Sequence, residues 1–284
     1  MKLARFDAGN GARVGIVRDD GIIDIVEAGA PYATMAEVIA GGDEALAALR
    51  TIAGGSHRTV PLSSVRLLAP VERAGKYLAI GMNYQKHLEE ADRLGVARSK
   101  HQVWFNKQTS CLSGPHDDIV PGVTEQLDYE VELGLVIGRA AKGVSRTDAL
   151  SHVFGYFVAN DVSARDWQFH SATFTMGKSF DTHGPIGPWI VTADEIPEPQ
   201  ALQLRSLVNG EVRQDNNTAN MIHPIDAQIA YLSTAFTLEP GDLIATGTPE
   251  GVGIGMEPQR FLQPGDIVRC EVEGIGAIEN RVVA

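Results

Sequence analysis

The sequence contains only two cysteines among its 284 residues. Cys111 and Cys270 lie far apart and belong to no Cys-x-x-Cys pair or other ligand or redox motif. A structural zinc site or a catalytic thiol needs such partners nearby, so the sequence favours neither. We expect both cysteines to be reduced packing residues of a cytoplasmic protein.

Positive charge is also scarce, because 24 lysines and arginines face 36 aspartates and glutamates, a net charge of −12. Nucleic acids and anionic membrane surfaces are bound through basic surfaces, so neither is an expected partner. No segment approaches the apolar length of a membrane span, and the N-terminal residues lack the apolar core of a signal peptide. We therefore expect a soluble protein whose anionic ligands would be bound by locally gathered basic residues.

Two common catalytic motifs are missing. No Gly-x-Ser-x-Gly elbow occurs, which gives a covalent serine hydrolase little support. The glycine-rich segment 246–255 lacks the Lys-Ser/Thr ending of a P-loop and the Rossmann spacing, so nucleotide binding is not expected. This segment could bring backbone N–H groups and hydroxyls close to a ligand anion, or it could be a plain turn.

Two glutamates stand two residues apart in the otherwise apolar segment 127–138. Side chains alternate along a strand, so Glu130 and Glu132 share one face, roughly 7 Å apart. An arbitrary Glu-x-Glu usually lies on a solvated edge strand, but the apolar run 133–137 is typical of a strand covered on both faces. Two buried like charges need a cation, and we predict a divalent metal.

A third ligand is expected from Asp161, which ends another apolar strand. Oxygen-only ligands favour Mg²⁺ or Mn²⁺ over zinc. Three carboxylates fill only part of an octahedral shell, so coordination positions remain for water or substrate oxygens. The sequence thus predicts a catalytic metal site.

Further candidate residues flank these ligands. His87 and Glu90 are three positions apart on a helix expected to begin after Asn83, and a carboxylate that accepts one imidazole proton activates the other nitrogen as a base. Arg165 could hold a carboxylate in a bidentate fork, and Lys178 offers a compact charge to an enolate. The bland alternative for each is a solvated surface side chain, and Lys107 is a weaker candidate of the same kind.

The pattern of elements predicts an α+β protein that is mainly β. The expected N-terminal elements are strands at 2–6, 13–17 and 22–26, a hairpin turn at Asp19-Asp20-Gly21 and a helix at 43–51. A polar stretch then ends a small domain, which we place at residues 1–65. Residues 66–284 contain many short β runs and few long helical patterns, so we expect one strand-rich domain there.

Six segments, taken in order, resemble the fumarylacetoacetate hydrolase family in its bacterial acylpyruvate hydrolase-like branch. They are residues 81–90, 105–115, 130–133, 160–166, 177–181 and 246–253. The resemblance covers the chain from about residue 70 onward and implies a mixed β-roll catalytic domain, preceded by a small N-terminal domain, in a protein that usually forms homodimers.

The resemblance also assigns roles. It implies that Glu130, Glu132 and Asp161 bind Mg²⁺ or Mn²⁺, and that His87 and Glu90 activate water on a lid helix. The remaining residues that it places at the site are Lys178 as a catalytic group and Arg165, Gln168, Lys107 and Thr248 as substrate contacts. Many relatives have Lys-Pro where this chain has Lys107-Gln108, a departure that concerns substrate identity.

The implied activity is hydrolysis of the carbon–carbon bond of a 2,4-dioxo acid to pyruvate and a carboxylic acid. The substrate would be a small anionic acylpyruvate, such as fumarylpyruvate or maleylpyruvate from the catabolism of aromatic compounds. Decarboxylation of oxaloacetate or isomerisation of 2-hydroxyhepta-2,4-diene-1,7-dioate at the same site are the alternatives. A binding protein without turnover should lack part of the His–Glu pair, which this sequence keeps.

Overall fold

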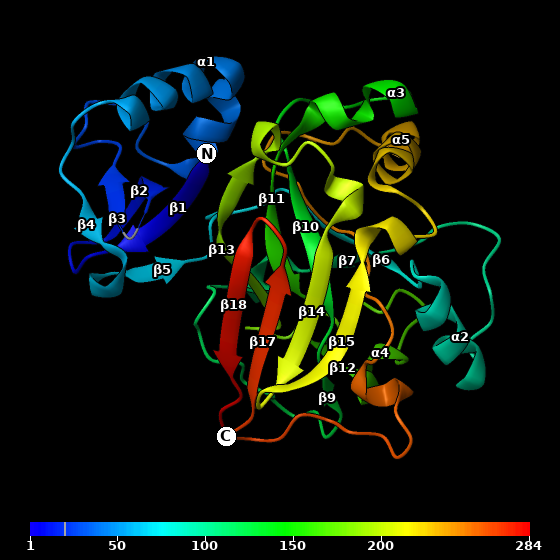
Figure 1. Ribbon diagram of the computed structural model, residues 1–284. Coiled ribbons are helices and arrows are strands. Elements are labelled where there is room, and N and C mark those ends of the chain that lie inside the picture. Colours follow the sequence, from blue (N-terminus) through cyan, green and yellow to red (C-terminus); the bar gives the residue numbers. More distant parts are fainter. Residues whose placement is uncertain (20) are drawn as a thin grey trace.

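The computed structural model describes residues 1–19 and 21–284, so the centre of the predicted hairpin turn, Asp20, lies outside the described residues. Within the described residues, twelve strands form one mixed sheet (Figure 1). They are β1 (Lys2–Asp7), β2 (Ala12–Arg18), β3 (Gly21–Asp24), β4 (Val60–Pro61), β5 (Arg66–Leu68), β6 (Tyr77–Gly81), β7 (Val103–Lys107), β8 (Leu112–Ser113), β10 (Val131–Ile137), β11 (Val153–Asn160), β13 (Gly184–Thr192) and β16 (Leu243–Ala245).

The remaining elements of the described chain are a four-stranded sheet, a short strand pair and the helices. The sheet contains β14 (Gln203–Val208), β15 (Glu211–Asn217), β17 (Ile267–Val272) and β18 (Gly276–Arg281), and the pair is β9 (Leu127–Asp128) with β12 (Ser163–Ala164). The α-helices are α1 (Met35–Gly54), α2 (Gln85–Arg93), α3 (Arg146–Ala149), α4 (Arg165–Gln168) and α5 (Ile225–Ala235), and short 3₁₀ turns occur between the other elements. The predicted class, α+β and mainly β, is confirmed.

Strand β10 lies at the centre of the large sheet, between β11 and β16. One of its faces, with Leu133 and Leu135, belongs to the core beneath the four-stranded sheet, while Val136 on the other face belongs to a second core. Every residue of β10 is buried. The expectation of a strand covered on both faces is therefore confirmed, and the acids in this segment cannot be solvated from an open edge.

Close approach of β10 and β11 depends on a glycine. A Cβ at Gly134 would lie 2.1 Å from the ring of Phe157, which is the residue paired with it on β11. The absence of a side chain lets the aromatic ring cover the strand. This contact fixes the register that brings residue 130 opposite residue 161 at the strand ends.

The N-terminal strands extend the large sheet instead of forming a separate one, because β1 pairs with β13 as well as with β2 and β5. Since β5 begins at Arg66, the first strand after the predicted boundary pairs with the N-terminal strands. Figure 1 shows the N-terminal layer and α1 beside the body of the molecule. Where the first domain ends remains a prediction.

The predicted helix at 43–51 forms the second part of α1, after a non-helical residue at Gly42, and the first part, which begins at Met35 behind a capping box of Thr34 and Glu37, was missed. One strand boundary in this layer was wrong. The third strand ends at Asp24 rather than residue 26, since the Asp24 carboxylate accepts hydrogen bonds from the N–H groups of Val26 and Glu27 and turns the chain. Both signals were local and could have been found in the sequence.

None of the helices among the described residues has the length and apolar character needed to cross a membrane.

Replacing Leu135 with alanine should lower the free energy of unfolding by about 2–5 kcal/mol, because the side chain is fully buried in a strand packed on both faces. Urea unfolding would measure the change. Val212→Ala on β15, where the side chain is half exposed, is the matched control and should shift stability by less than about 0.5–1 kcal/mol. Equal effects of the two substitutions would contradict this account of the core.

Candidate metal centre and active-site cavity

Three buried carboxylates converge where β10 and β11 meet. Glu130 precedes β10, Glu132 lies in it, and Asp161 follows β11. One oxygen of each lies within 4.8 Å of the others. Antiparallel pairing causes this convergence, because Val131 pairs with Asn160 and the N–H of Asp161 donates to the carbonyl of Glu130 over 2.9 Å. The structure thus brings together the predicted ligand set, which could hold a divalent metal.

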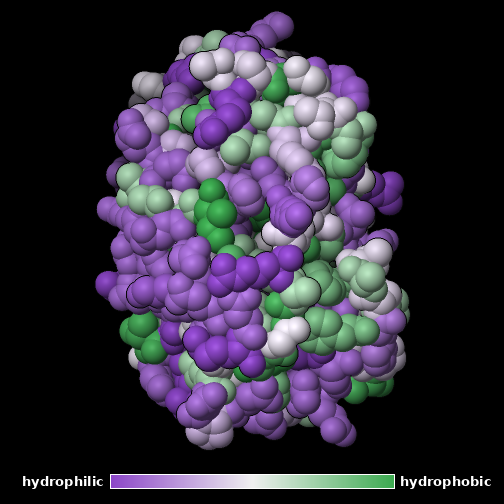
Figure 2. Space-filling view, turned by 90° about the vertical axis from the view of Figure 1, so that its right-hand side faces the viewer, coloured by the Kyte–Doolittle hydropathy of each residue, from purple (hydrophilic) through white to green (hydrophobic). Residues whose placement is uncertain are grey.

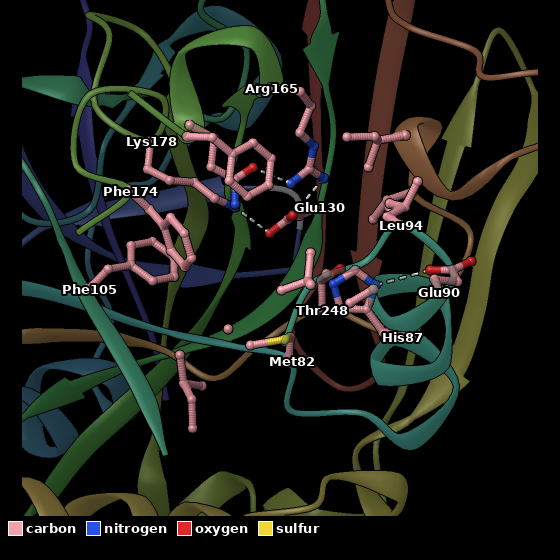
Figure 3. A pocket seen from close by; sticks show the side chains of 18 residues that line it. Met82, His87, Glu90, Leu94, Phe105, Glu130, Arg165, Phe174, Lys178 and Thr248 are labelled. Carbon is pink, nitrogen blue, oxygen red and sulfur yellow. Dashed lines mark hydrogen bonds and ion pairs between the residues drawn. The ribbon is translucent and has the colours of Figure 1, made fainter. Parts of the chain in front are cut away.

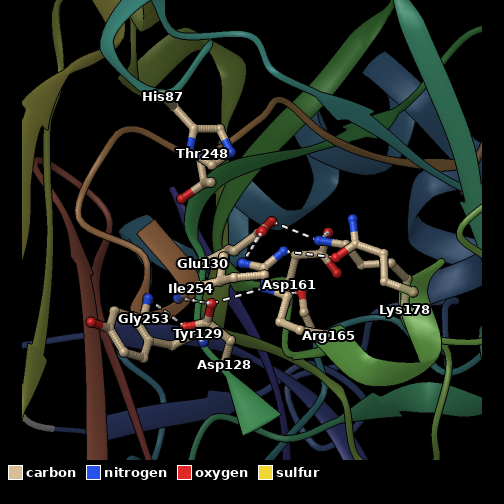
Figure 4. Close-up of polar contacts among 12 residues, drawn as sticks. His87, Asp128, Tyr129, Glu130, Asp161, Arg165, Lys178, Thr248, Gly253 and Ile254 are labelled. Atoms are coloured by element: carbon tan, nitrogen blue, oxygen red, sulfur yellow. Dashed lines mark hydrogen bonds and ion pairs between the residues drawn. The ribbon is translucent and has the colours of Figure 1, made fainter. Parts of the chain in front are cut away.

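Basic side chains compensate for two of these carboxylates (Figure 4). The Lys178 ammonium lies 2.8 Å from Glu130 and 2.9 Å from Asp161, and the Arg165 guanidinium lies 2.7 Å from Glu130. Within the described part of the chain, the hydrogen bond found for the Glu132 carboxylate is a backbone one, from the N–H of Gly247 at 2.8 Å. Glu132 therefore carries the least compensated of the three charges.

The pKa values of the two glutamates move in opposite directions. Burial opposes ionisation of Glu130, but Lys178 and Arg165 outweigh it and bring its pKa to about 2. Burial, reinforced by the charges of Asp161 and Glu130, raises the pKa of Glu132 well above its usual value. A cation bound among the three would offset both the burial and the repulsion that raise the pKa of Glu132, and three carboxylate oxygens suit Mg²⁺ or Mn²⁺.

Lys107 does not occupy the position predicted for it. Its side chain is fully buried, its ammonium lies 2.5 Å from Asp161 and also donates to the carbonyl of Lys178, and it is absent from the cavity lining. The structure corrects the predicted substrate contact: Lys107 holds Asp161 from behind. Sequence reasoning missed this because the two partners lie 54 positions apart.

The glycine-rich segment directs its N–H groups to carboxylates of the protein itself. Besides the bond from Gly247 to Glu132, Gly251 donates to Glu90 over 3.0 Å, and Gly253 and Ile254 donate to Asp128 over 2.7 and 3.0 Å. These N–H groups bind side-chain anions of the chain, whereas the sequence suggested a ligand anion or a plain turn. One loop therefore fixes three acids of the site.

Asp128 is a site residue that sequence reasoning missed. It is fully buried, and besides the two loop N–H groups it accepts a 2.8 Å hydrogen bond from Nε of Arg165. Arg165 in turn donates to Gln168 over 2.9 Å, and its pKa is raised because Asp128 and Glu130 outweigh the effect of burial. The available signal was alternation, since Asp128 lies two positions before Glu130 and shares its face.

The predicted dyad is formed on α2. Nδ1 of His87 lies 3.0 Å from Oε2 of Glu90, whose other oxygen accepts the Gly251 N–H. Nε2 is left for the cavity, which His87 lines (Figure 3). The sequence suggested Asn83 as the cap of this helix, and the structure corrects that suggestion. The Asn83 side chain donates to the carbonyls of Thr246 and His223, and the helix begins after Tyr84 without a side-chain cap.

A cavity lies in front of Glu130, the member of the carboxylate cluster that lines it. Seven of the predicted site residues line it: His87, Glu90, Glu130, Arg165, Gln168, Lys178 and Thr248. Thr248 donates to the carbonyl of Val131 over 2.9 Å, which ties the glycine-rich loop to β10. Figure 2 shows the face of the molecule on the α2 side as mainly hydrophilic, with hydrophobic side chains interspersed.

Two family models match the chain. Residues 76–283 match "Fumarylacetoacetate (FAA) hydrolase C-terminal", and residues 1–70 match "Rv2993c-like, N-terminal". A curated relative from Bos taurus, oxaloacetate tautomerase FAHD2A, mitochondrial, is 40% identical over 100% of this chain and 92% of its own length.

Two solved structures are similar over the whole chain. The fumarylacetoacetate hydrolase from psychrophilic Exiguobacterium antarcticum has a TM-score of 0.85 and 37% identity, and covers 100% of this chain and 99% of that one. Maleylpyruvate hydrolase from Sphingobium sp. SYK-6, in complex with manganese(II) and pyruvate, has a TM-score of 0.83 and 34% identity at the same coverage.

Manganese should stabilise the protein more at pH 8 than at pH 5. Because the pKa of Glu132 is raised in the folded protein, its protonation stabilises the folded state, fully so below the unfolded-state pKa of about 4.5. This stabilisation is lost as pH rises through the folded-state pKa. Metal binding needs the ionised group, so affinity rises with pH. Each added kcal/mol should raise Tm by roughly 2–4 °C, measurable by calorimetry at fixed Mn²⁺ concentration.

The opposite shift of Glu130 does not oppose this trend. Its contribution is complete above about pH 4.5 and is lost only as pH falls toward its folded pKa of about 2. Glu132→Gln should abolish most of the Mn²⁺-induced rise in Tm and its pH dependence, whereas Glu125→Gln, an exposed control, should preserve both. A rise in Tm that survives in Glu132→Gln would count against this ligand set.

Proposed function

Because the chain belongs to the fumarylacetoacetate hydrolase family, we propose that it is a divalent-metal-dependent enzyme that hydrolyses a carbon–carbon bond of an acylpyruvate. The products would be pyruvate and a carboxylic acid. One observation carries this proposal: Glu130, a member of the carboxylate cluster, and the His87–Glu90 dyad line the same cavity from different elements. Hydrolysis of a dioxo acid needs both groups, one for the oxo-acid oxygens and one for the attacking water.

Glu130, Glu132 and Asp161 would hold Mg²⁺ or Mn²⁺, which when bound acts as a Lewis acid toward the oxygens of the oxo acid. The relative crystallised with manganese and pyruvate supports both the metal and the pyruvate product. Arg165, fixed by Asp128 and Gln168, presents its guanidinium at the same end of the cavity and orients the anionic head of the substrate.

The proton transfers can be assigned to the chain's own groups. Nε2 of His87 takes a proton from water while Glu90 holds the imidazolium that forms. The hydroxide adds to the distal carbonyl carbon, and the bond between that carbon and the adjacent methylene breaks with its electron pair left on the methylene carbon. Lys178, which lies at the carboxylate cluster, returns a proton to that carbon and completes pyruvate.

The bovine relative supports a second candidate function, the tautomerisation of oxaloacetate, because the similarity spans this whole chain. Enolisation, like decarboxylation of the same substrate, needs the oxo-acid site and a proton shuttle but no attacking water. The isomerisation of a hydroxydiene dioate belongs to the same group of alternatives. The complete dyad favours hydrolysis over these reactions and over a binding protein without turnover.

The proposal also includes the cellular setting expected from the sequence. The enzyme would act in the cytoplasm as a homodimer on a small anionic oxo acid, and aromatic-compound catabolism is a fitting source of such substrates. Size-exclusion chromatography with light scattering would test the dimer directly.

Metal-loaded protein incubated with acetylpyruvate should produce pyruvate and acetate in equal amounts, followed by proton NMR. A sample treated with a chelator should leave the substrate unchanged, and added Mn²⁺ should restore turnover. If the loaded protein leaves acetylpyruvate unchanged but rapidly interconverts the keto and enol forms of oxaloacetate, hydrolysis is rejected in favour of oxaloacetate tautomerisation.

Replacing Glu90 with glutamine should lower kcat by roughly 10²–10⁴-fold, because the imidazolium loses its counter-charge. Glutamine keeps an oxygen for the Gly251 N–H, so the helix should remain in place and KM should change little. Glu89→Gln, an exposed neighbour on α2, is the control and should keep kcat within about twofold. An unchanged kcat in Glu90→Gln would remove the dyad from the mechanism.

A further inference from the structure

The cavity is charged at the carboxylate end and carries the His87–Glu90 dyad beside Leu94, and apolar side chains make up most of the remaining lining (Figure 3). The charged end holds Glu130, Arg165 and Lys178. The apolar wall comes from several segments far apart in the sequence, and its members are Met82, Leu94, Phe105, Phe169, Phe174 and Ile254. A ligand anchored at the carboxylate cluster therefore extends into an apolar space.

The aromatic part of this wall is continuous and begins beside the charged end. Phe174 packs edge-to-face against both Phe105 and Phe169, with ring centroids 6.0 Å apart in each pair. The Phe105 ring also lies 5.2 Å from the ammonium of Lys178. The side chain that returns the proton thus adjoins the apolar wall directly, and the acyl group next to the bond cleaved meets that wall.

The basic groups that line the cavity are already paired. His87 lies against Glu90, Arg165 against Asp128 and Glu130, and Lys178 against Glu130 and Asp161. Among the described residues that line the cavity, no further lysine, arginine or histidine occurs. A second carboxylate at the far end of a substrate would lose part of its hydration against the apolar wall without gaining a counter-charge, which is unfavourable.

We propose that the acyl group accepted by this cavity is uncharged and apolar, an alkyl or aryl chain, in contrast to the fumaryl and maleyl groups that end in a carboxylate. The inference rests on the proposed function for the oxo-acid head of the ligand and concerns the opposite end. Binding strength then grows with the apolar surface buried against Leu94 and the phenylalanines, by about fourfold for each methylene.

Two 2-oxo acids of matched shape share the oxo-acid head and differ only at the distal end, so they test the distal end alone. In 6-methyl-2-oxoheptanoate an isopropyl group replaces the distal carboxylate of 2-oxoadipate, and neither compound has a bond that the proposed hydrolysis would break. Isothermal titration calorimetry of the Mn²⁺-loaded protein should give the apolar compound a Kd at least about tenfold lower. Equal affinities, tighter binding of 2-oxoadipate, or failure of both to bind would overturn the inference.

Variants at the end of α2 test the location of the preference. Leu94 is 45% exposed at the C-cap of this helix, so substitution there should not unfold the protein. Leu94→Arg should erase or reverse the preference by gaining affinity for 2-oxoadipate. Leu94→Gln, the neutral control, should weaken only the apolar compound. A Leu94→Arg protein that keeps the original ratio of affinities would contradict the proposed position of the acyl group.

Arg93 provides a second control, since it lines the neighbouring hollow beside Glu90 and Leu94 rather than the cavity. Arg93→Ala should leave the ratio of affinities unchanged, and a selective loss of 2-oxoadipate binding would show that Arg93 binds a distal carboxylate. Because these measurements follow binding, they stay separate from the NMR assay. If the NMR assay shows no hydrolysis but calorimetry still shows tighter binding of the apolar compound, the proposed reaction is rejected and the apolar site is kept.

Discussion

The structure depends on compensating negative charge that is buried in one place. Asp128, Glu130, Glu132 and Asp161 are all nearly inaccessible to solvent, and removing four carboxylates from water would cost several kcal/mol each without partners. The buried side chains of Lys107, Arg165 and Lys178 and the N–H groups of one loop supply those partners. Among the described residues, no basic side chain pairs with Glu132. This remaining imbalance makes the cluster suited to a divalent cation.

The glycine-rich loop connects the parts of the site mechanically. Its successive N–H groups bind Glu132 in the cluster, Glu90 on α2, and Asp128 behind Arg165. Gly251 has φ +98°, and a Cβ there would lie 2.1 Å from the carbonyl oxygen of Arg213, so the loop can follow this path only with glycine. The position of the dyad relative to the carboxylate cluster is therefore set by backbone geometry.

The same arrangement separates two tasks within the cavity. The charged end, compensated from behind by Lys107 and Asp128, can receive the anionic head and the developing charge of an oxo acid. The apolar wall offers dispersion contacts and excludes water from the far end. Family membership does not by itself select the reaction, because relatives similar over the whole chain carry the names of different reactions.

The sequence by itself determined the features that depend on local periodicity. Alternation along 127–138 put both glutamates on one face, a spacing of three put His87 beside Glu90, and the mainly β composition followed from short, turn-punctuated runs. Only the tertiary structure decided which distant groups complete the site. Lys107 reaches Asp161, Asn83 bridges to Thr246 instead of capping its helix, and β1 joins β13, because strand register and chain crossovers bring together residues whose separation carries no local signal.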